Sequence, residues 1–123
     1  MIEHVSFNVT PAHAEACAGF YELLGFVRIE PPAGLGARSI WLKSGSTSIH
    51  LMFRDRDGVD VARSGPAGAG HVALVVPNHA AVLAALGAAG VEIDPRTEYW
   101  DAPRSYVRDP AGNLVELMAA APQ

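Results

Sequence analysis

Residues 4–9 read HVSFNV, and residues 71–76, which lie 67 positions further along the chain, read HVALVV. A second pair of stretches repeats in the same order: residues 49–52 (IHLM) are echoed 66 positions later by residues 115–118 (VELM). Repetition at a nearly constant offset is typical of a chain built from two copies of one structural unit. Each copy also carries two residues of the kinds that bind metal ions, in corresponding places. The repeat therefore predicts the fold and indicates a site to which both copies contribute.

Both halves of the chain are expected to contain a strand, a helix and three further strands. In the first half, His4, Ser6 and Asn8 alternate with apolar residues, which is the two-residue period of a half-buried strand. Thr10-Pro11 is a typical helix start, because threonine is a good N-cap and proline suits the first turn. The first module, residues 1–54, is predicted to have strands at 3–9, 26–29, 38–43 and 48–54 and a helix at 12–24.

The second half, residues 70–123, repeats this order. Strands are expected at 70–76, 91–94, 105–108 and 114–119, with a helix at 77–89 and a tight turn at 109–113 (DPAGN). Residues 55–69 are rich in glycine and polar residues and are expected to form a linker. The sequence thus predicts an α+β fold made of two tandem βαβββ modules.

Composition excludes several classes of protein. A net charge of −4 and a pI near 5.6 argue against binding to nucleic acid, whose phosphates require a basic surface. The single cysteine, Cys17, cannot form an intrachain disulfide. No apolar run approaches the roughly 18 residues that span a membrane, so a membrane partner is not expected. Cytoplasmic residence is the resulting expectation.

Four side chains at predicted strand positions could bind a metal ion: His4, His50, His71 and Glu116. His4 precedes His50 by 46 positions, and His71 precedes Glu116 by 45. If the two modules pack with approximate twofold symmetry, equivalent strands face each other and the four side chains can converge. Imidazole nitrogen and carboxylate oxygen suit Zn, Ni, Co, Fe(II) or Mn, and the set offers no thiolate for an iron–sulfur site.

The simpler alternative for His4, His50 and His71 is that each is structural or half-exposed, as a single histidine in a strand usually is. Their occurrence together at equivalent positions of a repeat favours ligation. His13 and His79 lie in or at the start of the predicted helices, and both are expected to be solvated.

Four more residues are candidates for binding a substrate. Arg104 and Tyr106 are at even spacing from Glu116 across the predicted hairpin, so they can share its face of the sheet. Arg104 could bind an anionic group and Tyr106 could donate a hydrogen bond. Trp41 and Met52 could line an apolar pocket. The alternatives are that Arg104 is simply exposed, that Tyr106 lies at the rim and that Trp41 belongs to the core.

Five stretches together resemble the vicinal oxygen chelate superfamily, which includes glyoxalases, bleomycin resistance proteins and dioxygenases. They fall in the family order along almost the whole chain, at residues 4–7 (HVSF), 19–26 (GFYELLGF), 49–51 (IHL), 70–74 (GHVAL) and 109–117 (DPAGNLVEL). The resemblance is specific for the fold and much less specific for the reaction.

The resemblance implies two modules whose strands form a curled mixed sheet, a cup around one divalent metal per site. Its four ligand positions are occupied here by His4, His50, His71 and Glu116. It also implies a homodimer and a lyase- or isomerase-type enzyme that stabilises negative charge on two neighbouring oxygens of a small substrate. Glu116, the only carboxylate of the four, is the candidate catalytic base. A metal-free drug- or metabolite-binding protein like the bleomycin resistance proteins, a thiol transferase and a dioxygenase of the same fold remain alternatives.

Overall fold

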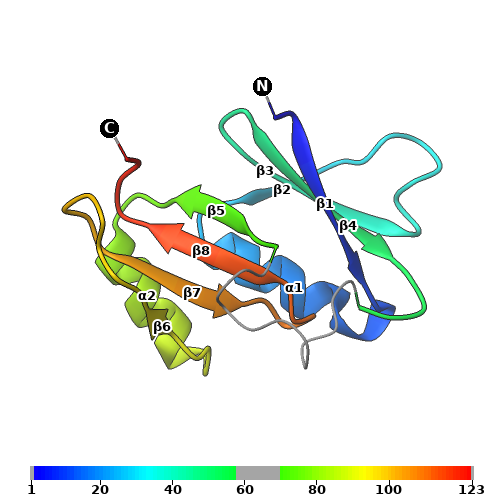
Figure 1. Cartoon of the computed structure of the whole chain (residues 1–123). Helices are drawn as coiled ribbons and strands as arrows, with labels where there is room; N and C mark the ends of the chain where they lie inside the picture. Colours follow the sequence, from blue (N-terminus) through cyan, green and yellow to red (C-terminus); the bar gives the residue numbers. More distant parts are fainter. Residues whose placement is uncertain (1, 58–69, 123) are drawn as a thin grey trace.

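A computed structural model describes residues 2–57 and 70–122 and shows the same order of elements in each half of the chain (Figure 1). Most of the predicted linker, residues 58–69, lies outside the described residues. The first module contains β1 (His4–Val9), α1 (Pro11–Leu23), β2 (Val27–Ile29), β3 (Ser39–Ser44) and β4 (Thr47–Phe53). The second contains β5 (Val72–Val75), α2 (His79–Ala88), β6 (Asp94–Pro95), β7 (Arg104–Arg108) and β8 (Leu114–Met118).

Each module forms its own four-stranded mixed sheet. The strand orders are β1-β4-β3-β2 and β5-β8-β7-β6, which are the same order in the two modules. In each sheet the first strand pairs in parallel with the last, and the other pairs are antiparallel. The predicted α+β fold of two βαβββ modules is therefore confirmed, with two separate sheets and no closed barrel.

One predicted strand is much shorter in the structure. Residues 91–94 were expected to be extended, but β6 pairs with β7 only at Asp94 and Pro95. The N–H of Val91 donates to the carbonyl of Leu86 and so completes the end of α2, with Gly90 at φ +85°. Because the Val91 N–H is bonded to the end of the helix, pairing with β7 begins only three residues later, at Asp94.

The strand register places the candidate ligands on one face of each sheet. Ser6 pairs with His50, and His50 with Trp41, so these side chains share what we call the His50 face. In the second sheet Ala73 pairs with Glu116, and Glu116 with Tyr106, on what we call the Glu116 face. The opposite faces carry the apolar residues, such as the fully buried Leu51 and Leu117, and pack into the core.

Helix α1 contributes buried residues to a core that both modules share. Cys17 and Tyr21 on this helix are fully buried, and the same cluster contains Leu86 of α2 and Val115 of β8. The Tyr21 hydroxyl donates to Asp109 Oδ2 at 2.7 Å, across 88 positions of sequence. The two modules are thus joined by apolar packing and by a buried hydrogen bond.

The two histidines outside the repeat positions differ from each other. His13 is half-exposed, and its Nδ1 pairs with Asp57 Oδ2 at 2.8 Å. His79 is buried, and its Nε2 lies 3.3 Å from the carbonyl oxygen of Leu117. The prediction that His79 is solvated is therefore wrong, because its ring is buried and lies against the backbone of β8.

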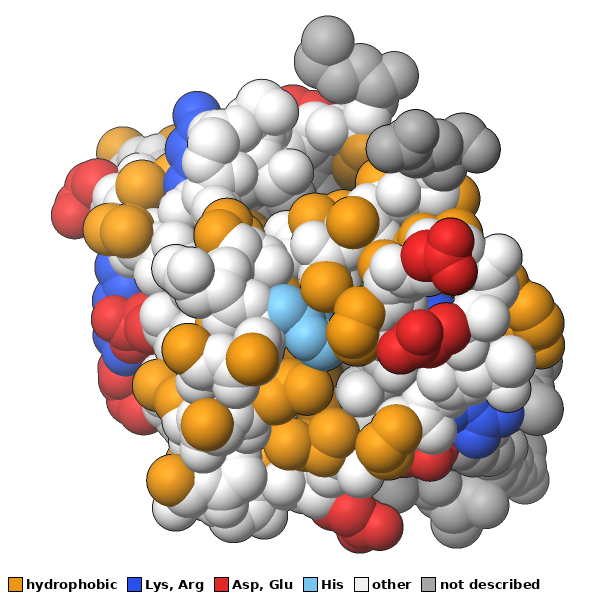
Figure 2. Space-filling model, turned by 90° about the vertical axis from the view of Figure 1, so that its left-hand side faces the viewer, with side chains coloured by type: hydrophobic (Ala, Val, Ile, Leu, Met, Phe, Trp, Pro, Cys, Tyr) orange, Lys and Arg blue, Asp and Glu red, His pale blue; other side chains and the backbone are white. Residues whose placement is uncertain are grey.

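Helix α2 carries no charged side chain, and its sequence is HAAVLAALGA. Figure 2 looks at the molecule from the side on which α2 lies and shows apolar side chains spread across that face, with most charged groups towards its rim. Within the described ranges, no helix is long and apolar enough to cross a lipid bilayer.

Candidate metal site in two halves

Strands β1, β4 and β3 bring three aromatic rings together on the His50 face. The rings of His4 and His50 stack with centroids 4.1 Å apart, and the Trp41 ring stacks on the other side of His50 at 3.7 Å. His4 Nδ1 pairs with the carboxylate of Glu3. The stack fixes the orientation of the His50 ring, as a metal ligand requires.

Burial gives His50 the properties of a metal ligand. The residue is 6% exposed, and its Nε2 has no hydrogen-bond partner among the described residues. An unpaired buried polar atom is costly and needs an explanation, and a bound metal ion would supply one for His50 Nε2. Burial, followed by the nearby His4, lowers the pKa of His50 below its ordinary value. The ring is therefore neutral near pH 7, which leaves a nitrogen lone pair to bind a metal.

Strand β8 and the residue that precedes β5 form a second pair of candidate ligands. His71 Nε2 lies 3.2 Å from Glu116 Oε1, and the Glu116 side chain is 8% exposed. Two atoms that each bind a metal at about 2.1 Å would lie about 3 Å apart at a right angle. The observed spacing fits a shared metal ion, and the donors are of the kinds that Zn, Ni, Co, Fe and Mn accept.

Strand β7 supplies the other contacts of this pair. Arg104 Nη1 lies 3.4 Å from Glu116 Oε2, and the Tyr106 and His71 rings are nearly perpendicular with centroids 5.1 Å apart. The Arg104 side chain is only 12% exposed, so it offers little surface to a substrate. Tyr106 lies beside both members of the pair, where it can contact a bound molecule.

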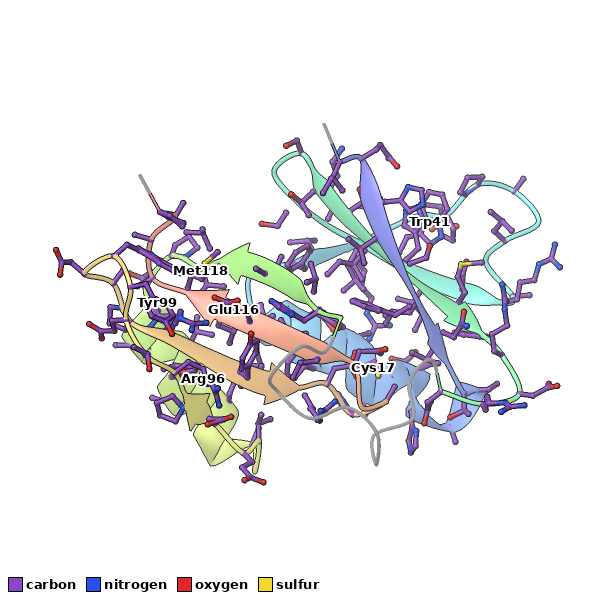
Figure 3. The ribbon with its side chains drawn as sticks, in the orientation of Figure 1. Cys17, Trp41, Arg96, Tyr99, Glu116 and Met118 are labelled. Atoms are coloured by element: carbon purple, nitrogen blue, oxygen red, sulfur yellow. The ribbon has the colours of Figure 1, made fainter. Side chains whose placement is uncertain are left out.

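The four candidate ligands do not come together within the described parts of one chain. There, no three of the His, Cys, Asp and Glu residues are arranged to hold a metal ion. Figure 3 shows Trp41 and Glu116 on different sheets. The structure therefore pairs His4 with His50 and His71 with Glu116, and each pair is half of the predicted site.

Two cavities of the size that small ligands occupy each include one candidate site residue, Tyr106 or His71, in their lining. One, of about 570 Å³, is lined by Tyr106, Asp94 and Arg108 together with apolar residues such as Val91. The other, of about 650 Å³, lies between β1 and β5 and reaches His71. Met52 is half-buried on the His50 face and lines neither of these cavities.

The structure reveals an equivalence that the sequence reasoning missed. Trp41 faces His50 across β3 and β4, just as Tyr106 faces Glu116 across β7 and β8. The signal was present, because Trp41 and Tyr106 are 65 positions apart, close to the offsets of the repeat. Each half-site thus has an aromatic residue on the strand next to its second ligand.

Comparisons with known proteins agree with this architecture. The family model described as Glyoxalase/Bleomycin resistance protein/Dioxygenase superfamily matches residues 2–117. A glyoxalase family protein from Bacillus anthracis is 29% identical, with a TM-score of 0.76 over 96% of this chain and 93% of that one. A search of curated proteins finds no match.

Two more distant structures share the fold alone. Lactoylglutathione lyase from Agrobacterium tumefaciens is 20% identical, with a TM-score of 0.65 over 96% of this chain and 92% of that one. TnmS3, an antibiotic binding protein from Streptomyces sp. CB03234, is 22% identical, with a TM-score of 0.65 over 95% of this chain and 93% of that one. The same fold therefore carries both an enzyme and a binding protein.

Proposed function

Because the chain belongs to the glyoxalase/bleomycin resistance protein/dioxygenase superfamily, we propose that it is a divalent-metal-dependent enzyme of lyase or isomerase type. Its substrate is a small molecule with two neighbouring oxygens. The observation that carries the proposal is the pair of His71 and Glu116. His71 Nε2 lies 3.2 Å from Glu116 Oε1, and the Glu116 side chain is nearly buried. The unpartnered Nε2 of the neutral His50 is the matching feature of the other half.

We further propose that the complete site forms between two subunits of a homodimer. One subunit supplies His4 and His50, and the other supplies His71 and Glu116. Two such sites form in each dimer, because a twofold axis repeats the contact. This arrangement accounts for ligand pairs that lie on separate sheets of one chain.

Each residue of the site then has a role. The metal, when bound, supplies a positive charge that stabilises negative charge on the substrate oxygens. Glu116 is the only carboxylate of the set and can accept a proton from the substrate. Tyr106 can donate a hydrogen bond to a substrate oxygen. Trp41 and Met52 are on the His50 face and can contact the apolar part of the substrate.

Metal content tests the proposal directly. Protein purified without an affinity tag is expected to hold about one divalent ion per chain, and EDTA should lower its thermal midpoint because bound metal stabilises the folded state. Adding back Zn, Ni, Co, Mn or Fe(II) one at a time identifies the metal that restores the midpoint. A thermal-shift screen of glutathione, coenzyme A and phosphonate compounds with that metal present then narrows the substrate. Protein that holds no ion and responds to none contradicts a metalloenzyme.

A binding protein without turnover is the second candidate. The observation in its favour is that both oxygens of Glu116 have protein partners, His71 and Arg104, and that the His50 ring stacks on Trp41. In that case the same residues line a cleft for a drug or metabolite. Ligand-induced stabilisation that is unchanged by EDTA would favour this function.

A further inference from the structure

We propose that Arg104 is a positioning residue that holds the carboxylate of Glu116 in the orientation for metal binding, and that it does not contact the substrate. This inference rests on the proposed metal site. It replaces the role of substrate clamp that the sequence suggested for Arg104.

The two oxygens of Glu116 have different partners. Oε1 lies 3.2 Å from His71 Nε2, and Oε2 lies 3.4 Å from Arg104 Nη1. Because Arg104 holds Oε2, Oε1 lies on the side of His71. There Oε1 and His71 Nε2 can both reach one metal ion. Partners of this kind, which bind a ligand and not the metal, fix the ligand's direction and are worth a large share of metal affinity.

Arg104 is itself fixed by several neighbours. Its Nε donates to the carbonyl of Thr97 at 2.7 Å, and its guanidinium lies 5.3 Å from the ring centroid of Tyr99 and 5.7 Å from that of Trp100. Trp100 is anchored in turn, because its indole N–H donates to the carbonyl of Ala120 at 2.9 Å. A planar guanidinium stacks on aromatic rings and donates in fixed directions, which suits a positioning role better than a lysine would.

The internal repeat provides a comparison within the same molecule. Arg104 pairs with Met118 in the second sheet, and the equivalent pair in the first sheet is Ser39 with Met52. Ser39 is buried, and its hydroxyl donates to the carbonyl of Leu35. The half with His50 thus has a serine at this position, and the half with Glu116 has an arginine.

Electrostatics explains this difference. A carboxylate that is nearly buried is costly unless a positive group or hydrogen bonds compensate its negative charge, and a histidine side chain carries no negative charge to compensate. This explains why Arg104 lies beside Glu116, whereas the equivalent position in the first sheet is occupied by Ser39.

The test is Co²⁺ binding by the metal-free full-length protein, followed by visible absorption. Arg104→Met removes the charge and the donors but keeps an unbranched side chain, and it is expected to weaken Co²⁺ binding about 10- to 100-fold and to change the cobalt spectrum. Arg28→Met is the control, because it makes the same change of charge at an exposed residue of the other sheet, where Arg28 pairs with Glu15 and Glu22. The control should bind Co²⁺ like the wild type.

Arg104→Lys is a second variant that tests the same role if Arg104→Met does not fold. It keeps the positive charge without the planar fork, and its affinity is expected to lie between those of the wild type and Arg104→Met. Circular dichroism of the metal-free proteins separates lost folding from lost binding. If folded Arg104→Met or Arg104→Lys binds Co²⁺ as tightly as the wild type, the positioning role is wrong. If the wild type itself binds no Co²⁺, the proposed metal site is wrong and the role of Arg104 with it.

Discussion

Asp109 shows how one residue can join distant parts of this molecule. Its Oδ1 accepts from the backbone N–H groups of Ala111 and Asn113, and its Oδ2 accepts from the Asn113 amide and the Tyr21 hydroxyl. Burial raises the pKa of Asp109, and these hydrogen bonds act in the opposite direction. Burial also raises the pKa of Tyr21 well above its usual value, so the phenol remains a donor.

Replacement of Tyr21 by phenylalanine should therefore lower stability. The ring still packs in the core, but Asp109 loses one donor in a buried place, which costs about 1–2 kcal/mol. Urea unfolding followed by circular dichroism measures the free energy of unfolding. Tyr99→Phe is the control, since Tyr99 is 74% exposed and its hydroxyl deletion should leave stability unchanged. Equal stability of the two variants would show that the Tyr21 bond contributes nothing.

At the level of elements, the start of α1 depends on a residue far along the chain. Thr10 is at the N-cap position, as the sequence predicted, but its side chain makes no capping hydrogen bond. Asp57 Oδ1 instead accepts from the Thr10 N–H at 2.8 Å, and Oδ2 pairs with His13 in the first turn. An acidic side chain here satisfies a backbone donor and favours the positive end of the helix dipole.

Asp57→Ala should therefore destabilise the protein by about 1 kcal/mol near neutral pH. Burial would raise the pKa of Asp57, but hydrogen bonds from Thr10 and His13 outweigh it and hold the pKa below the usual 3.8. A carboxylate with a lowered pKa stabilises the fold above its unfolded-state value, and this contribution is lost as pH falls through the folded-state value.

The difference between wild type and Asp57→Ala should thus shrink below about pH 4. Thermal midpoints measured from pH 7 to pH 3 test this dependence. Asp55→Ala, which makes the same change of charge at an exposed position two residues earlier, should show no such effect.

At the level of the whole molecule, the two sheets each carry one pair of candidate ligands, and the proposed site needs both pairs. If a homodimer assembles each site, a His50→Ala subunit still supplies His71 and Glu116, and a Glu116→Ala subunit still supplies His4 and His50. A dimer of one subunit of each kind then has one intact site and one site that lacks both residues.

Mixing these two variants should therefore restore metal binding that each lacks alone. After unfolding and refolding together, random pairing predicts about a quarter of the wild-type metal content. Metal analysis of the dimer fraction from gel filtration measures this. Recovery of no metal, although the mixed dimers form, would mean that each site lies within one chain.

Much of the fold could be predicted because its signals are local or repeated. The alternation in residues 4–9, the helix start at Thr10-Pro11 and the turn at residues 109–113 each depend on neighbours in sequence. The short β6 and the buried His79 were not predicted, for different reasons. Residues 91–94 alternate like a strand, but the Val91 N–H donates to the Leu86 carbonyl at the end of α2. The burial of His79 depends on its contact with the Leu117 carbonyl in β8, 38 positions away, which no local pattern encodes.

The same division applies to the candidate site. The sequence by itself determined the two-module architecture and selected His4, His50, His71 and Glu116, because a repeat keeps equivalent residues in register. Only the tertiary structure decided that these four form two separate pairs, that Trp41 covers His50, and that Arg104 is directed at Glu116. Those facts depend on how sheets are placed in space and on where side chains meet across strands, and strand spacing in sequence does not specify either.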